Sequence, residues 1–426
     1  MLDGSIDRQS PRGAFREVPY MGVIFVVDEA HKRGFWNGHP DWSNLGQGQP
    51  EVGLYEGAPP RIDQVKIRPE DHAYGRLEGI DELREEVAAY YNRLYRRGMS
   101  SQYTADNVAI ANGGRLALTR AMAALGEVKI GYQLPDYTAY EDMFNLHLAR
   151  MEPIAVPTRE EDGFQLTSSQ YREALAAHDL DAFVVSNPCN PTGNVIQGDE
   201  LAAIVETSAE QRTTLLLDEF YSHFIYTEDG KPADGPVSGA AYIEDVERDP
   251  VVLFDGLTKS FRYPGWRVGW VVGPKEMVET TARTASSIDG GPSRIAQLAA
   301  LQALEPAQAD QETTALRVNF VKKRNLMVER LEAMGIRFAK APLSTFYCWA
   351  SLDQLPEPLD NAMEFFWRAL DYQVMTVPGK FFDVNPGGAR SGDSPYERWM
   401  RFSFGPPMDN MVMGLDRLAE MLKKAL

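Results

Sequence analysis

The chain contains very little cysteine: two residues, Cys189 and Cys348, among 426. Two cysteines cannot build a disulfide framework, and such scarcity is typical of proteins from reducing compartments. The longest early apolar run, MGVIFVV at 21–27, is too short to span a bilayer. Residues 1–20 mix charges with prolines, which is not a signal-peptide pattern, and we expect them to form a mobile or draped arm. The sequence therefore predicts a cytoplasmic protein with no membrane partner.

Basic charge is also scarce, because 43 lysines and arginines stand against 61 acidic residues, for a formal net charge of -18. A nucleic-acid partner requires a basic surface, so this class of partner is not expected. A local basic pocket for a small anion remains compatible with the composition. With 44% hydrophobic residues the chain can build a packed core, and its length favours one large domain with a smaller one.

Short apolar runs rich in β-branched residues alternate with helix-like segments through the middle of the chain. They lie at 108–111, 128–132, 182–186, 213–218, 251–255 and 266–272. Runs that are apolar on both faces suit buried strands of a mostly parallel sheet, and the alternation predicts crossover helices. Buried helix segments fit less well, since each run is short and bounded by Gly, Pro, Asn or Asp.

The two ends of the chain are predicted to form a second, smaller α+β unit. Periodicity predicts helices at about 21–34, 81–97 and 307–334, strands near 345–350 and 399–404, and a terminal helix after 408. The predicted fold class is α/β, with a large domain built on a mostly parallel sheet and a small α+β domain built from both chain ends. The predicted divisions are an arm and part of the small domain at 1–60, the large domain at 61–306, and a linking helix with the C-terminal small domain at 307–426.

The stretch ANGGRLALTRA at 111–121 follows an apolar run and opens a helical pattern. Gly113 and Gly114 allow a tight turn, so that free N–H groups at the helix start can face an anion. Arg115 adds positive charge. A phosphate site is one interpretation, and an ordinary strand-to-helix turn is the other.

Polar residues follow two further apolar runs. Asn190 lies in SNPCNPTGN, where two Asn-Pro steps and a glycine force an irregular loop at a strand end, the place where open α/β sheets bind ligands. Asp218 ends the run in LLLDEFY, and a carboxylate there is costly unless it is paired. A cationic ring nitrogen would pair with it, with Tyr221 three residues on, while capping of the next segment is the alternative.

The stretch GLTKSFRYPGWR at 256–267 follows another run and contains Lys259. A lysine at such a strand end, near other cations, can have a lowered pKa and act as nucleophile and base, although a solvated lysine is the ordinary case. Arg267 is a candidate phosphate clamp. Arg401 in RFSFG is a candidate for bidentate carboxylate binding, and Tyr137 in LPDYTAY for stacking on a planar ring. Taken together, these groups match the needs of pyridoxal 5′-phosphate.

In this order, the motifs NPCNPTG, DEFY, TKSFRYPGWR and RFSF resemble those of fold-type I pyridoxal-phosphate enzymes of the class I/II aminotransferase family, from about residue 20 to the C-terminus. The resemblance implies pyridoxal 5′-phosphate as cofactor, no metal, amino-acid and 2-oxo-acid substrates, a ping-pong mechanism and a homodimer. It implies that Lys259 binds the cofactor covalently and then moves the proton of the substrate.

The resemblance also implies roles for the other residues. Asp218 pairs with the ring nitrogen, Tyr137 stacks on the ring, and Tyr221 and Asn190 bind its phenolic oxygen. The implied phosphate contacts are Gly114, Arg115, Thr258, Arg267 and, from the neighbouring subunit, Tyr74 of YGRLEG. The implied substrate contacts are Arg401, Asn190 and Gly48 of NLGQGQP.

The chain departs from the family pattern at three places. Gly256 stands where a serine often contacts the phosphate, and Gly291 replaces a second hydroxyl residue, so we expect Arg115 or Arg262 to compensate. Ser344 and Thr345 stand where a glycine often precedes the FY pair, near the substrate pocket of the family. These departures leave another reaction on the same cofactor open, namely elimination, side-chain cyclisation or oxidation of an amino acid.

Overall fold

A computed structural model describes residues 14–15, 18 and 20–425, so most of the predicted arm at 1–20 lies outside the described residues. Its centre is a seven-stranded sheet of order β2-β8-β7-β6-β5-β3-β4. The strands are β2 (Val108–Ala111), β3 (Val128–Leu134), β4 (Met151–Pro157), β5 (Ala182–Ser186), β6 (Thr214–Asp218), β7 (Val251–Gly256) and β8 (Gly269–Val272). Strands β4, β3, β5, β6 and β7 pair in parallel, whereas β8 is antiparallel to both of its neighbours. The predicted strands are confirmed, and β4 is an addition to them.

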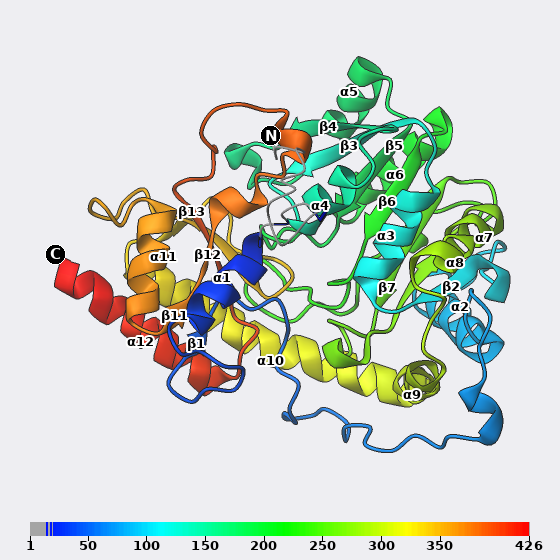
Figure 1. The fold of residues 1–426 in the computed structure, drawn as a ribbon, viewed down its shortest axis with the longest axis horizontal. Coiled ribbons are helices and arrows are strands. Elements are labelled where there is room, and N and C mark those ends of the chain that lie inside the picture. The colour runs from blue at the N-terminus through cyan, green and yellow to red at the C-terminus, as the bar shows by residue number, and fades with distance from the viewer. Residues whose placement is uncertain (1–13, 16–17, 19, 426) are drawn as a thin grey trace.

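Helices cover both faces of this sheet (Figure 1). They are α2 (Asp81–Tyr95), α3 (Gly114–Ala124), α4 (Ala139–Asn145), α5 (Ser168–His178), α6 (Asp199–Gln211), α7 (Lys275–Arg283), α8 (Ala285–Ile288) and α9 (Arg294–Leu304). Consecutive strand residues enter different cores: Leu216 and Phe254 belong to one, and Leu215 and Leu253 to the other. A sheet buried on both faces explains why its strands are continuous apolar runs.

The smaller unit uses both ends of the chain, as the predicted fold class requires. β1 (Ser43–Asn44) pairs in parallel with β11 (Val374–Met375). A separate antiparallel sheet contains β12 (Val377–Pro378), β13 (Trp399–Ser403), β10 (Tyr347–Ser351) and β9 (Arg337–Phe338). The helices α1 (Gly22–His31), α11 (Ala362–Asp371) and α12 (Met408–Ala425) pack around them. The domain boundaries near residues 60 and 306 stay predictions.

The long helix α10 (Pro306–Ala333) crosses the lower part of the molecule in Figure 1, from α9 to the smaller unit. Proline at its first position and the Glu305 side chain, which accepts a hydrogen bond from the Gln308 N–H, fix its start. The segment between β1 and α2 follows the same edge of the molecule (Figure 1). Short 3-10 turns complete the chain: η1 (Pro69–His72), η2 (Ala105–Asn107), η3 (Glu160–Asp162), η4 (Gly239–Ala241), η5 (Pro264–Trp266), η6 (Gly379–Phe382) and η7 (Pro386–Gly388).

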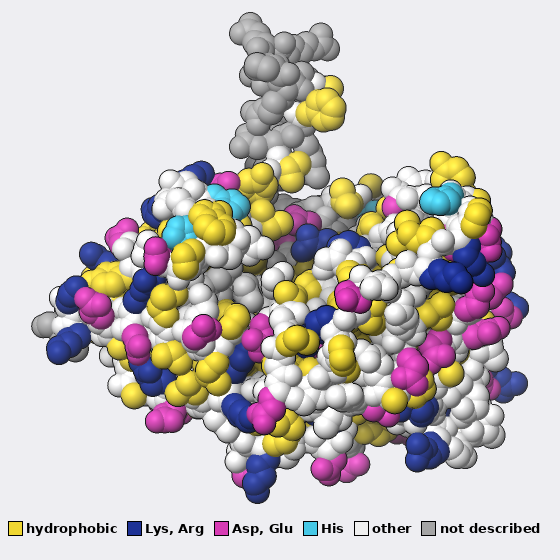
Figure 2. Space-filling view, turned by 90° about the horizontal axis from the view of Figure 1, so that it is seen from below, with side chains coloured by type: hydrophobic (Ala, Val, Ile, Leu, Met, Phe, Trp, Pro, Cys, Tyr) yellow, Lys and Arg dark blue, Asp and Glu magenta, His cyan; other side chains and the backbone are white. Residues whose placement is uncertain are grey.

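Figure 2 shows the distribution of charged side chains over one face of the molecule. On the face shown in Figure 2, lysine and arginine side chains are mixed with acidic ones and do not gather into one basic patch. None of the helices in the described part of the chain is long and apolar enough to cross a membrane.

Candidate active site

A cavity of about 310 Å³ lies at the carboxyl ends of the parallel strands β5, β6 and β7. Open α/β sheets bind their ligands at this edge. The predicted site residues that line it are Gly48, Gly114, Arg115, Tyr137, Asn190, Asp218, Tyr221, Thr258, Lys259, Arg267 and Arg401. Five further residues line the cavity, namely Val23, Leu118, Ser186, Phe220 and Tyr347. Tyr74 lies outside the cavity, fully exposed in the single chain.

The start of α3 forms one end of the cavity and depends on two glycines. A Cβ on Gly113, whose φ is +88°, would lie 2.3 Å from Arg267 Nη2. A Cβ on Gly114 would lie 1.8 Å from the ring of Phe220. Only glycine therefore lets Arg267 and Phe220 pack against the first turn of the helix.

The same end of the cavity has the chemistry of an anion site. The first N–H groups of α3 have no intrahelical partners, and the helix dipole favours negative charge there. Arg115 and Arg267 add positive charge, with Arg115 Nη2 donating to the Tyr137 hydroxyl at 2.8 Å. The Oγ1 of Thr258 is buried and has no hydrogen-bond partner among the described residues. A phosphate group would satisfy all of these donors.

The strand β8 explains the absence of a hydroxyl at Gly256. A Cβ at this position would lie 2.5 Å from the carbonyl oxygen of Val268 and 2.6 Å from Cα of Gly269. Because backbone atoms cannot yield as a flexible side chain can, the close approach of β7 and β8 excludes serine here.

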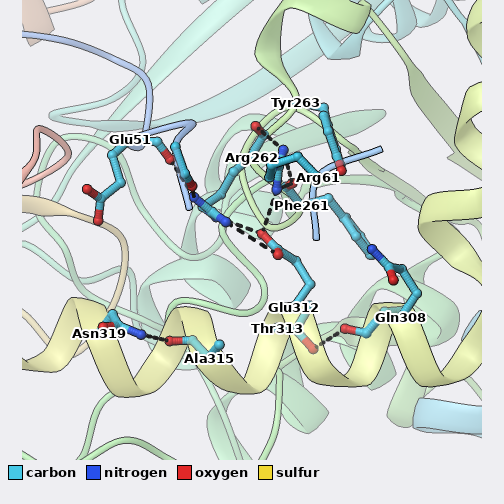
Figure 3. A network of polar contacts seen from close by, with 12 residues as sticks. Glu51, Arg61, Phe261, Arg262, Tyr263, Gln308, Glu312, Thr313, Ala315 and Asn319 are labelled. Carbon is cyan, nitrogen blue, oxygen red and sulfur yellow. Dashed lines mark hydrogen bonds and ion pairs between the residues drawn. The ribbon is translucent and has the colours of Figure 1, made fainter. Parts of the chain in front are cut away.

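Arg262 does not enter the cavity, so the expectation that it could compensate in the phosphate site is wrong. Its side chain is buried, with Nε donating to Glu312 at 2.6 Å and Nη1 donating to the carbonyl oxygens of Glu51 (3.0 Å) and Gly53 (2.7 Å). Arg61 donates to Glu312 at 3.2 Å and to the carbonyl oxygen of Arg262 at 2.9 Å. Figure 3 shows Arg262 pointing to Glu312 on α10. Arg262 thus ties the loop after Lys259 to α10 and to residues 51–61.

Asp218 lies buried at the end of β6, on the floor of the cavity. The Tyr140 hydroxyl donates to its Oδ2 at 2.8 Å, and the N–H of Phe220 donates to Oδ1 at 3.5 Å. Burial raises the pKa of Asp218 to about 6, although the bond from Tyr140 favours the charged form. A cation that enters the cavity beside this carboxylate would be its natural partner.

Lys259 follows β7, and its side chain faces the cavity, where Nζ donates to the carbonyl oxygen of Gly48. Loss of hydration, together with the charges of Arg401 and Arg267, lowers the pKa of Lys259 to about 7. A large part of the amine is therefore neutral at physiological pH, as a nucleophile requires.

Arg401 lies on β13 and is buried, with 1% of its surface exposed. Its Nη1 donates to Asn190 Oδ1 at 2.7 Å and its Nη2 to the carbonyl oxygen of Gly46 at 2.9 Å. Its Nε is without a hydrogen-bond partner in the described structure. A buried guanidinium held by neutral oxygens is suited to bind a carboxylate supplied by a ligand.

The segment with Ser344 and Thr345 leads directly into the cavity. Thr345 has a φ of +60°, a region that favours glycine, which is the residue expected from the family pattern. The next residues include Tyr347, whose hydroxyl lies 2.8 Å from the hydroxyl of Tyr221. The aromatic rings of Tyr263 and Trp266 stack on each other outside the cavity lining.

The chain is similar to known aminotransferases along most of its length. The family model described as aminotransferase class I and II matches residues 40–418. A probable aspartate/prephenate aminotransferase of Thermus aquaticus is 30% identical, over 82% of this chain and 84% of that protein. An aspartate aminotransferase of Sulfurisphaera tokodaii is 27% identical, over 89% of each chain.

Solved structures agree with this similarity. The aspartate aminotransferase of Thermus thermophilus, determined with maleate, has a TM-score of 0.76 at 25% identity and covers 95% of this chain and 97% of its own. An aminotransferase from Mycobacterium tuberculosis has a TM-score of 0.76 at 26% identity, covering 96% and 97%. The chain thus belongs to the aminotransferase class I and II family, whose fold it has, and is an enzyme that transfers an amino group between an amino acid and a 2-oxo acid.

Proposed function

We propose that the cavity binds pyridoxal 5′-phosphate and that Lys259 is its covalent attachment point. The observation that carries the proposal is the position of the Lys259 amine in a cavity whose lining includes the start of α3, Asp218 and Arg401. When bound, the cofactor supplies an electron sink that withdraws charge from the substrate Cα.

The residues around the cavity fit each part of this cofactor. The start of α3, Arg115, Thr258 and Arg267 offer unsatisfied donors and positive charge for a phosphate. The buried carboxylate of Asp218 suits a protonated ring nitrogen. The phenol of Tyr221, with 6% of its surface exposed, and the Asn190 amide are candidates for the phenolic oxygen, and the ring of Tyr137 for stacking.

In transamination, Lys259 would carry the proton. The Lys259 amine would accept and hold the proton of the substrate Cα, and pyridoxal 5′-phosphate would supply the electron sink for the charge left on that carbon. Arg401 would orient the substrate through its carboxylate. The carbonyl oxygens of Gly46 and Gly48, which accept bonds from Arg401 and Lys259, keep the segment 46–48 over the reacting groups.

Uptake of the cofactor is expected to follow the titration of Lys259. Only the neutral amine attacks, and with a pKa of about 7 its fraction increases with pH up to about 8 and then levels off. The rate at which cofactor-free protein gains visible absorbance should show this profile. A free lysine derivative, which has an ordinary pKa of about 10.4, serves as control, and the rate of its reaction with the cofactor should still increase above pH 8. The same rise above pH 8 in the protein would contradict the assignment.

We also propose that the active unit is a homodimer. Tyr74 is fully exposed in the single chain, and Ile67, Ile288 and Ile295 are exposed as well. The pair between Arg294 and Asp71 (2.8 Å) joins η1 to α9, so the chain segments that carry Ile67, Tyr74 and Ile295 lie near one another. Sedimentation of the holoenzyme tests this proposal, and a monomer at assay concentrations would contradict it.

Aspartate is the amino donor that we propose, because the relatives are named for it. Excess aspartate alone should convert the bound cofactor to its amine form with release of one equivalent of oxo acid, and a 2-oxo acid should restore it. Release of ammonia without an acceptor would contradict transamination. If another amino acid but not aspartate converts the cofactor to its amine form, only the choice of aspartate as the donor would be wrong.

A further inference from the structure

Tyr347 is the first residue of β10 and is completely buried, yet its side chain lines the cavity. In the antiparallel pair of β10 and β13, Tyr347 is opposite Ser403. Arg401 lies two residues away from Ser403 on the same strand, so Tyr347 and Arg401 are diagonal neighbours on one face of the sheet. The register of this sheet therefore places the tyrosine beside the candidate carboxylate-binding arginine.

Tyr347 contacts both halves of the site. Its hydroxyl lies 2.8 Å from the hydroxyl of Tyr221, the candidate partner of the cofactor's phenolic oxygen. The guanidinium of Arg401 lies over its ring, 4.1 Å from the centroid, within the range of a cation–π interaction.

The backbone before Tyr347 is held firmly. Thr345 is completely buried with a φ of +60°, a conformation that is strained for a residue other than glycine. Its N–H donates to the Phe224 carbonyl oxygen at 3.0 Å, and its own carbonyl oxygen accepts from the Tyr226 hydroxyl at 2.7 Å. Its Oγ1 accepts from the Tyr347 N–H at 3.0 Å. This strained threonine, which stands where the family often has glycine, thus helps to fix Tyr347.

We propose that Tyr347 is a positioning residue that couples the two halves of the active site. Its hydroxyl orients the Tyr221 phenol toward the cofactor, and its ring orients Arg401 toward the substrate carboxylate. The inference rests on the proposed function, because it requires the cofactor beside Tyr221.

The direction of the effect follows from the hydrogen-bond pattern. When Tyr221 donates its proton to the cofactor's phenolic oxygen, Tyr347 is the donor in the pair of phenols, and a phenol that accepts a bond becomes a stronger donor. A donor to the phenolic oxygen stabilises the deprotonated, more negative form of the bound cofactor and so lowers the pKa of its visible absorbance. Loss of the Tyr347 hydroxyl should therefore raise that pKa.

Two variants of the holoenzyme separate the two contacts. Tyr347→Phe removes the hydroxyl and keeps the ring, and it should raise the pKa of the visible absorbance by about 0.5–1, the equivalent of one net hydrogen bond. Its affinity for maleate, a carboxylate that cannot react, should stay unchanged. Tyr347→Leu also removes the ring, and it should in addition weaken maleate binding about tenfold.

Two further variants serve as controls. In a Tyr221→Phe background, Tyr347→Phe should have no further effect on the titration, because the phenol through which it acts is gone. Tyr171→Phe removes another buried tyrosine hydroxyl, which lies outside the cavity lining and is hydrogen-bonded to the Ser208 hydroxyl at 2.6 Å. This variant should leave both the titration and the maleate affinity unchanged.

The outcomes distinguish this inference from the proposed function. The role of the hydroxyl is overturned if the visible absorbance of the wild type titrates and Tyr347→Phe leaves its pKa unchanged. It is also overturned if Tyr347→Phe shifts this pKa equally in the Tyr221→Phe background. Unchanged maleate affinity in Tyr347→Leu overturns the role of the ring. A wild type that gains no visible absorbance with pyridoxal 5′-phosphate overturns the proposed function, and the inference with it.

Discussion

Replacing Lys259 by alanine is expected to lower kcat by about 10⁴-fold and to abolish the visible absorbance of the bound cofactor. The substitution removes both the attachment point and the base that moves the substrate proton. No other lysine lines the cavity, among the residues described. Steady-state rates with aspartate and an absorbance spectrum of the purified holoenzyme measure the two effects.

Two variants make this prediction specific. Lys259→Arg keeps the positive charge but not a titratable amine, and it should be as inactive as the alanine variant. Lys231→Ala removes a lysine whose side chain is 73% exposed and pairs with Asp229, and it should behave as wild type. Full visible absorbance in Lys259→Arg would show that the amine is not the attachment point.

Replacing Arg262 by alanine is expected to lower the free energy of unfolding by about 3–5 kcal/mol. Its guanidinium is fully buried against Glu312. Its removal leaves this carboxylate with Arg61 as its remaining ion-pair partner among the described residues, while the carbonyl oxygens of Glu51 and Gly53 lose a charged donor. Urea unfolding of the cofactor-free protein measures the loss.

An exposed pair provides the comparison. Arg248 is 84% exposed and lies 3.6 Å from Asp245, so Arg248→Ala should change stability by less than about 0.5 kcal/mol. A double variant of Arg262 and Glu312 should lose less free energy of unfolding than the sum of the two single variants, because each single variant already removes the interaction between the two side chains. Strict additivity would contradict the direct pairing of these two side chains.

The fold is largely predictable from the sequence, because a sheet buried on both faces requires continuous apolar strands. The exception is β4, which contains Pro153 and Pro157 and has exposed or half-buried residues along most of its length. It lies at the edge of the sheet, where proline is tolerated because one side of the strand needs no partner. Neither its pattern nor its composition is that of a buried strand.

The sequence predicts which residues of the site lie at the end of a strand. The direction of a side chain within a loop is not predictable in this way: Arg262 and Arg267 share one loop and both have a positive φ, yet Glu312, fifty residues away, determines where Arg262 points. The position of Tyr347 depends on the register between β10 and β13. The need for glycine at position 256 depends on the close approach of the β8 backbone. These are tertiary contacts that no local motif specifies.

Chemical mapping identifies the lysine that carries the cofactor, which we propose to be Lys259. The holoenzyme is reduced with borohydride, which makes the lysine–cofactor bond permanent, then digested and analysed by mass spectrometry. We predict one equivalent of phosphopyridoxyl label per chain on the peptide that contains Lys259. Label on a different lysine, in a preparation that retains activity, would show that Lys259 does not carry the cofactor.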